Sequence, residues 1–158
     1  MKQLLFFLLF FLLSALHAEQ LRIVADSFSS DEKSGVTVFK GAVKLRKGVD
    51  ELNASVITVY TDANQQPTKY VAKGNVSFSL QTEAKAIYKG RAGKAVFVPA
   101  NKEYHFYQDV TIKQVDEKKE INGEEVVIST VEGKARAKGA DKKPVIMTFE
   151  IKETEKKK

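Results

Sequence analysis

The chain has 158 residues, no cysteine, and 26 basic against 20 acidic side chains, which gives a net charge of +6. The absence of cysteine excludes disulfides, a thiol nucleophile and a lipoprotein acylated on cysteine. The length suffices for one domain with a hydrophobic core.

Residues 1–18 have the layout of a secretory signal peptide. Lys2 precedes an unbroken run of Leu and Phe from Leu4 to Leu13, and small residues surround Ala18, where a peptidase would cut. The apolar run is shorter than the roughly 20 residues that a membrane-spanning helix needs, which favours a cleaved signal peptide over the alternative, an uncleaved anchor. Export without cysteine indicates a periplasmic protein that is stabilised by sheet hydrogen bonds and apolar packing.

From residue 19 onward the chain predicts β-strands and almost no helix. Nine short stretches are rich in Val, Ile, Thr, Phe and Tyr and mostly alternate between apolar and polar residues, as strands with one buried face do. In chain order they are residues 36–39, 43–46, 56–60, 69–72, 76–80, 95–98, 104–107, 110–115 and 126–130. We expect an all-β domain over residues 19–150 and a basic flexible tail over 151–158.

Two short sequence phrases alternate along these strands. The first is an apolar residue, any residue, glycine, a small or turn residue, and valine. It occurs as FKGAV (39–43) and AKGNV (72–76), with weaker copies FYQDV (106–110) and AKGAD (137–141). The second begins at a small residue and has an apolar residue three places on; its anchors are Ala25, Ala54, Ala92 and Gly123. The spacing between like anchors is typical of stacked structural repeats.

We interpret both phrases as corners between strands of stacked rungs. Gly41 and Gly74 would permit a positive φ or the close approach of another backbone. The small residues Ala54 and Gly123 would leave room where two faces of the sheet converge. Successive rungs would then hydrogen-bond along one axis. The alternative is that Gly-Asn is an ordinary hairpin turn in a β-sandwich.

Alternation along the strands separates an apolar face from a polar one. The apolar face would carry Phe39, Val43, Leu45, Val76, Phe78, Phe106, Val110 and Ile112. Residues 94–100 (KAVFVPA) are apolar on both faces, so their direction is open. The apolar face could form a filled core or line a groove, and recurring small residues such as Ala54, Ala92 and Ala95 favour an interior with room for a guest.

No motif indicates catalysis, a metal or a cofactor. His105 is the only histidine beyond the signal segment and falls on the polar face of its strand. The G-x-S-x-G, P-loop and H-E-x-x-H motifs do not occur. We therefore predict a binding protein that is not an enzyme. Positive charge favours anionic partners, and after export these would be phosphorylated lipids rather than nucleic acid.

Taken together, these stretches resemble the organic-solvent-tolerance A-like (OstA-like) family, which includes the periplasmic bridge component A of the lipopolysaccharide (LPS) transport machinery. The resemblance rests on the order and spacing of LRIVADSF (21–28), VTVFKGAVKLRKG (36–48), ELNASVITVY (51–60), AKGNVSF (72–78), YKGRAGKAVF (88–97) and FYQDVTIKQV with INGEEVVI (106–128). It covers nearly the whole chain after the signal segment. Gln108 departs from it, since the family prefers glycine at this corner.

The resemblance implies a single antiparallel β-jellyroll, shaped as a slightly open, twisted V, that performs no reaction and binds LPS in the periplasm. Its interior would shelter the acyl chains of lipid A. The corresponding interior positions here are Leu21, Ile23, Phe39, Val43, Leu45, Phe78, Phe97, Phe106 and Ile112, to which alternation adds Val76 and Val110. The implied protein partners are the inner-membrane jellyroll component C, the N-terminal domain of the outer-membrane translocon component D, and further copies joined end to end.

Two alternatives stay open. If the signal segment were not cleaved, the chain would fit the inner-membrane-anchored component C of the same pathway. If the core were filled, the chain would be a structural or adhesive secreted β-module.

Overall fold

The computed structural model describes residues 20–153, so the predicted signal segment and residues 154–158 of the predicted tail lie outside the described residues. Within this range the chain forms ten strands and no helix, and hence no helix that could cross a membrane. The strands are β1 (Leu21–Val24), β2 (Ser27–Asp31), β3 (Val36–Lys47), β4 (Asp50–Thr61), β5 (Pro67–Gln81), β6 (Ile87–Val98), β7 (Glu103–Gln114), β8 (Lys119–Ser129), β9 (Lys134–Lys138) and β10 (Ile146–Phe149). All pairings are antiparallel, which confirms the predicted fold class.

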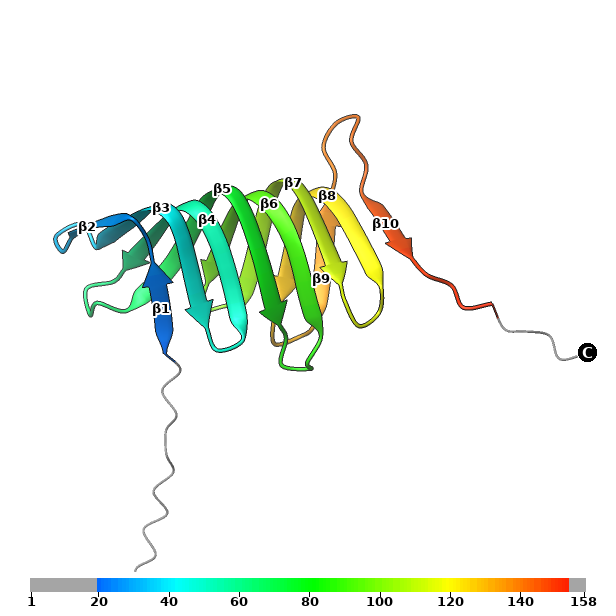
Figure 1. Ribbon diagram of the computed structural model, residues 1–158, viewed down its shortest axis with the longest axis horizontal. Coiled ribbons are helices and arrows are strands. Elements are labelled where there is room, and N and C mark those ends of the chain that lie inside the picture. Colours follow the sequence, from blue (N-terminus) through cyan, green and yellow to red (C-terminus); the bar gives the residue numbers. More distant parts are fainter. Residues whose placement is uncertain (1–19, 154–158) are drawn as a thin grey trace, which may run out of the picture.

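The strands form one sheet that is folded lengthwise into two arms. Its order is β1-β3-β4-β5-β6-β7-β8-β10, with β2 also pairing with β3 and β9 with β8. Figure 1 shows the strands stacked along the long axis, with β1 and β2 at one end and β9 and β10 at the other. Arm one contains β1, β10 and residues 43–47, 50–54, 76–81, 87–92, 110–114 and 119–123; arm two contains β2, β9 and residues 36–40, 56–61, 67–73, 94–98, 103–107 and 125–129. We call the line of corners between them the crest.

The central strands are longer than the sequence predicted. The stretches 36–39 and 43–46, predicted as separate strands, are the two halves of β3, and β3 to β8 each contain 11 to 15 residues. Each strand passes through the crest because a β-bulge can bend a strand without ending its hydrogen-bonded ladder.

The two alternating phrases correspond to the two sides of each bulge. At the crest, two residues of an odd-numbered strand oppose one residue of the next strand: 41–42 oppose 55, 74–75 oppose 93, and 108–109 oppose 124. In each pair both residues have positive φ, namely Gly41 84° and Ala42 41°, Gly74 82° and Asn75 46°, and Gln108 69° and Asp109 48°. Glycine adopts such a φ most readily and Asn and Asp follow, which explains the glycine of the first phrase and the turn residue after it. The anchors of the second phrase, Ala54 and Gly123 among them, do not have positive φ.

Glycines at the crest also make room for side chains of the neighbouring strand. A Cβ on Gly41 would collide with the carboxylate of Asp26, and one on Gly74 would lie 2.7 Å from Ser55 Oγ. At the third corner the arrangement is reversed, because Gly93 lies against the side chain of Gln108. The missing bulge glycine is therefore matched by a glycine on the preceding strand, β6.

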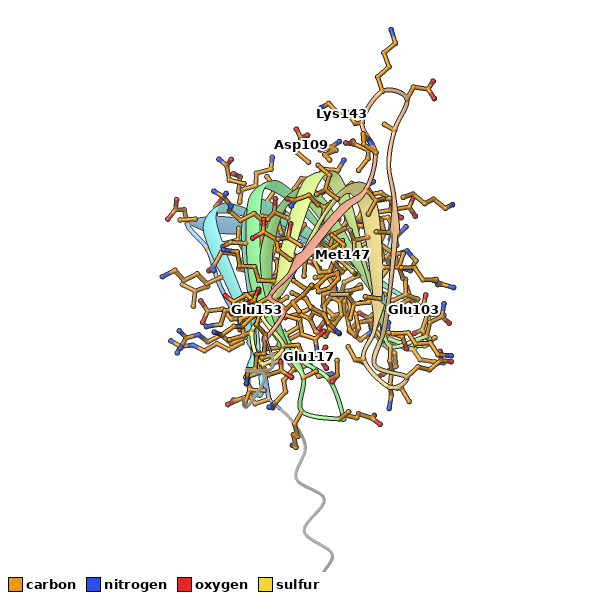
Figure 2. All side chains as sticks on the ribbon, turned by 90° about the vertical axis from the view of Figure 1, so that its right-hand side faces the viewer. Glu103, Asp109, Glu117, Lys143, Met147 and Glu153 are labelled. Carbon is orange, nitrogen blue, oxygen red and sulfur yellow. The ribbon has the colours of Figure 1, made fainter. Side chains whose placement is uncertain are left out.

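The last rung does not form a tight corner. Between β9 and β10, residues 139–145 extend beyond the crest as a small hairpin, in which an Ala140–Lys143 bridge closes the turn. Lys143 contacts Asp109 at 3.3 Å, and Figure 2 shows both side chains at the crest. The fourth copy of the first phrase, AKGAD, therefore lies where the chain passes between the arms, but it does not form the bulge with two positive φ angles that the other copies form.

Apolar side chains from both arms fill the space beneath the crest. The largest side chains that are less than 2% exposed are Phe106, Ile57, Leu80, Ile112, Ile128, Val43, Val76, Val110 and Val126. Phe78 of arm one stacks on Phe106 of arm two with ring centroids 3.9 Å apart. Gly90 permits this contact, since a Cβ there would lie 2.8 Å from the Phe78 ring. The two arms are thus joined by a packed core.

Candidate functional site

A cavity of about 430 Å³ opens between the arms on the side of the hairpin loops. Its apolar lining consists of Leu21, Leu45, Leu52, Ile57, Pro67, Tyr70, Ala72, Leu80, Ala95, Phe97, Pro99 and Tyr104, and Lys47, Asp50, Glu51 and Gln66 add polar groups. These residues belong to β1, β3 to β7 and the adjoining loops, so the cavity lies toward the N-terminal end of the stack. Its volume falls within the roughly 300–1,000 Å³ of typical ligand pockets.

An aromatic row forms the wall of the cavity on arm two. The ring centroids of Tyr70 and Phe97 lie 5.9 Å apart, and those of Phe97 and Tyr104 lie 4.4 Å apart. The row continues from Tyr104 to the buried Phe106 at 6.2 Å. Burial raises the pKa of the Tyr70 hydroxyl, so this group stays neutral at ordinary pH. The wall therefore presents a broad uncharged surface.

Polar groups from arm one lie at the mouth of the cavity. The Lys47 ammonium is 5.8 Å from the centroid of the Phe97 ring. The Tyr104 hydroxyl donates to Asp50 Oδ2 at 3.5 Å, and the Gln81 N–H donates to Asp50 Oδ1 at 2.8 Å. An apolar interior with an ammonium group at its mouth suits an amphiphile that has an apolar tail and an anionic head.

The arms also touch at the mouth through loops of β5–β6 and β8–β9. The Glu83 N–H donates to the Thr130 carbonyl at 2.9 Å, and the Lys102 ammonium lies 3.5 Å from the Glu83 carboxylate. The Thr130 N–H donates to the Lys102 carbonyl at 3.0 Å, which holds the two loops of arm two together. We call Glu83, Lys102 and Thr130 the clasp. It joins arm one to arm two across the mouth, on the β8 side of the cavity.

The structure separates the predicted lipid-binding residues into three groups. Leu21, Leu45 and Phe97 line the cavity. Val43, Val76, Phe78, Phe106, Val110 and Ile112 belong to the packed core and are at most 5% exposed. Ile23 and Phe39 are partly buried and pack against that core near the N-terminal edge. A bound molecule could reach the second group only if the arms moved apart.

Several lining residues were not singled out from the sequence. Tyr70 lies two places before Ala72, and Tyr104 two places before Phe106, so alternation along their strands was a signal that could have found them. Lys47 lies two places after Leu45 and Asp50 two places before Leu52, so alternation places them on the same face, although neither residue is apolar. In the described part of the chain, no group of His, Asp and Glu could hold a metal ion.

Comparisons with known proteins agree with this architecture. A family model described as LptA/(LptD N-terminal domain) LPS transport protein matches residues 22–134, which include every residue that lines the cavity except Leu21. A search of curated proteins found no match. A similar solved structure is that of LptH, described as the LptA homologous periplasmic component of the conserved lipopolysaccharide transport device from Pseudomonas aeruginosa. It superimposes with a TM-score of 0.74 at 20% identity, over 84% of this chain and 96% of that chain, which confirms the β-jellyroll.

Proposed function

Because the chain belongs to the LptA/(LptD N-terminal domain) family of LPS transport proteins, we propose that it is a periplasmic bridge that carries LPS from the inner to the outer membrane. In this role it shelters acyl chains of lipid A between its arms and catalyses no reaction. The observation that carries the proposal is the apolar cavity with its aromatic wall and with Lys47 at its mouth.

The physical basis of binding is burial of apolar surface. Each methylene group removed from water contributes about 0.8 kcal/mol, so an acyl chain along the aromatic wall is held by many non-directional contacts. Such contacts tolerate different chain lengths and allow the lipid to slide. An ammonium group at the mouth adds attraction for the phosphates of lipid A.

Accommodation of several acyl chains requires the arms to separate. The cavity of about 430 Å³ lies at the lower end of the usual pocket range. Opening of the clasp would extend the groove toward β8 and expose Phe78 and Phe106 along it. On this proposal the predicted residues that line the cavity, Leu21, Leu45 and Phe97, contact lipid first. The predicted residues of the packed core contact it as the groove widens.

The two ends of the stack are the proposed sites for protein partners. At the N-terminal end Phe28 is 69% exposed, and at the C-terminal end Ile146 and Phe149 are 55% and 53% exposed. Edge strands with free backbone groups pair readily with a strand of another protein. We assign these ends to further copies of the chain, to the jellyroll of component C and to the N-terminal domain of component D.

Site-specific photocrosslinking tests the groove. A photoreactive residue in place of Phe97 or Leu45 should capture LPS in cells, because both side chains line the cavity. The same residue at Lys44 or Ser79, whose side chains point away from the cavity, should capture little. Equal capture at all four positions, or none at Phe97 and Leu45, would contradict the proposal. The latter outcome would favour a structural module with a filled core.

A further inference from the structure

The outer face of arm two carries valine where a solvent-facing surface is expected to be polar. The middle row of outward positions across the arm contains, strand by strand, Ser29, Val38, Thr58, Val71, Val96, His105, Val127 and Arg136. Further valines flank this row. We call the set Val36, Val38, Val56, Val71, Val96, Val98 and Val127 the valine face. The sequence left the direction of the residues in KAVFVPA open. In the structure Phe97 points inward, and Val96 and Val98 point outward and belong to the valine face.

Arm one provides an internal comparison, because the same six strands run through both arms. Its outward positions on β3 to β8 are Lys44, Arg46, Glu51, Asn53, Ser77, Ser79, Gln81, Ile87, Lys89, Arg91, Thr111, Lys113, Glu120 and Asn122. Ile87, the first residue of β6, is the one apolar residue among them, and none is valine. The preference of strands for valine would act equally on both arms, so it does not explain why valine gathers on one of them.

No described element covers the valine face. The backbone of each described strand lies close only to its neighbours in the sheet, and Figure 1 shows no element outside either arm. The valines are half-buried by one another and by adjacent side chains, with Val127 the most buried at 8% exposed. The face therefore forms an apolar stripe across β3 to β8, which Thr58 and His105 interrupt in the middle row. With strands about 4.8 Å apart, the five spacings from β3 to β8 extend over about 24 Å.

Basic and aromatic side chains border the valine face on both sides. Toward the crest, the Lys94 ammonium lies 5.5 Å from the centroid of the Tyr107 ring. Toward the mouth, the Lys69 ammonium lies 4.4 Å from the centroid of the Tyr60 ring. Lysine and tyrosine both combine an apolar body with a polar tip, which suits them to the boundary between an apolar and an aqueous phase.

The charge on this face is predominantly positive. The outward basic residues of the arm are Lys40, Lys69, Lys73, Lys94, Lys134, Arg136 and Lys138, and the outward acidic ones are Asp31, Glu103 and Glu125. The Glu103 carboxylate already contacts His105 at 3.1 Å and Arg136 at 3.6 Å. A second copy placed on the same face would bring like charges together. An anionic surface would be attracted to it.

We propose that the valine face docks on the surface of an anionic phospholipid membrane. The valines rest at the boundary between headgroups and acyl chains, and the bordering lysines contact lipid phosphates. A bilayer surface offers what the face lacks in this structure, namely an apolar layer beneath a layer of negative charge. This role goes beyond the proposed carriage of LPS, because the face points away from the groove.

Flotation of the full chain with vesicles tests the docking. The probes are phosphatidylcholine vesicles with and without phosphatidylglycerol. Lys73→Glu combined with Lys94→Glu should lower partitioning to the anionic vesicles by about tenfold or more, since each lysine near such a surface adds to the attraction. The matched control is Lys89→Glu with Arg91→Glu, which makes the same change in net charge on arm one. It should alter partitioning by no more than about twofold.

A fluorescent label reports which face meets the membrane. The chain has no cysteine, so Val96→Cys and Ser77→Cys each provide one labelling site, on arm two and arm one respectively. An environment-sensitive dye at position 96 should shift to shorter wavelength on adding anionic vesicles, and the dye at position 77 should not. Equal shifts at both sites, or no partitioning to anionic vesicles, would overturn the proposal. Absence of LPS crosslinking together with vesicle binding would contradict the proposed carriage of LPS in the groove and leave the membrane docking supported.

Discussion

At the scale of single residues, the third corner shows how the crest tolerates a departure from its pattern. Gln108 has a φ of 69°, which a glycine would adopt more readily, and its side chain lies against Gly93. At the preceding bulge the small polar residue is Ser55 and the glycine is Gly74. In both corners a glycine lies against a polar side chain of the neighbouring strand. The glycine is on the later strand at Ser55–Gly74 and on the earlier strand at Gly93–Gln108. What the crest requires is one glycine for each such contact, since two side chains do not fit.

This exchange predicts coupling between residues 93 and 108. Gly93→Ser should lower the free energy of unfolding by about 1–3 kcal/mol, because the new side chain meets Gln108. In a Gln108→Gly background the same change should cost at least about 1 kcal/mol less, since it recreates the arrangement of Ser55 and Gly74. Urea unfolding of the four chains measures the coupling. Gln108→Ala is the control, because it shortens the side chain but keeps the strained φ. Strictly additive effects would contradict the exchange.

At the scale of elements, the clasp determines which part of the groove is open. The β5–β6 loop of arm one and the β8–β9 loop of arm two are joined through Glu83 and Thr130. The Lys102–Glu83 ion pair is exposed and contributes at most about 1 kcal/mol. On the proposed function, this ion pair and the single Glu83–Thr130 hydrogen bond between the arms are weak enough to open when a lipid supplies binding energy.

Locking the clasp should restrict lipid to the cavity. In a chain with Glu83→Cys and Thr130→Cys, a disulfide would hold the arms together at the point where their backbones are hydrogen-bonded. Oxidation should reduce LPS capture by a photoreactive residue at Phe78 by several-fold and leave capture at Phe97 nearly unchanged. Addition of a reductant should restore it.

The control for this experiment is Lys102→Cys with Thr130→Cys. These residues are also hydrogen-bonded, at 3.0 Å, but both belong to arm two, so their disulfide cannot hold the arms together. Unchanged capture at Phe78 in the oxidised Glu83 and Thr130 pair, with the disulfide verified, would show that lipid does not need the clasp to open.

At the scale of the whole molecule, the stack has two different ends and no closed edge. β1 and β2 form one end, and β9 and β10 form the other. An interface between two different edges does not close on itself, so copies joined in this way form open chains of increasing length. Figure 2 views the molecule from its C-terminal end. Met147 of β10 lies at this end and is 53% exposed.

Blocking either end should stop growth, and mixing the two blocked chains should restore a single joint. Phe28→Glu disables the N-terminal end and Met147→Glu disables the C-terminal end, because each places a charge on an exposed apolar position. Light scattering should show concentration-dependent assembly of the parent chain and monomers for each variant alone. An equimolar mixture should form dimers, since one intact end of each kind remains. Larger assemblies in the mixture, or none, would exclude an end-to-end interface.

Much of the fold could be predicted because its main features repeat along the chain. Alternation around Phe39 and Val43 depends on the two-residue period of a strand, and Gly41 and Gly74 mark backbone conformations that other residues adopt at a cost. The same signals were misread as strand ends. A bulge and a turn use similar residues, and only pairing on both sides of the bend distinguishes them.

The sequence by itself determined that this protein is all-β, that its strands have one apolar and one polar side through most of their length, and where the crest lies. These properties follow from side-chain period and local backbone preference. The tertiary structure alone decided that Phe97 borders a cavity while Phe106 is buried, and that Val96 faces outward. Such distinctions depend on how far the arms diverge and on which loops meet across the mouth, and residues distant in the chain set both.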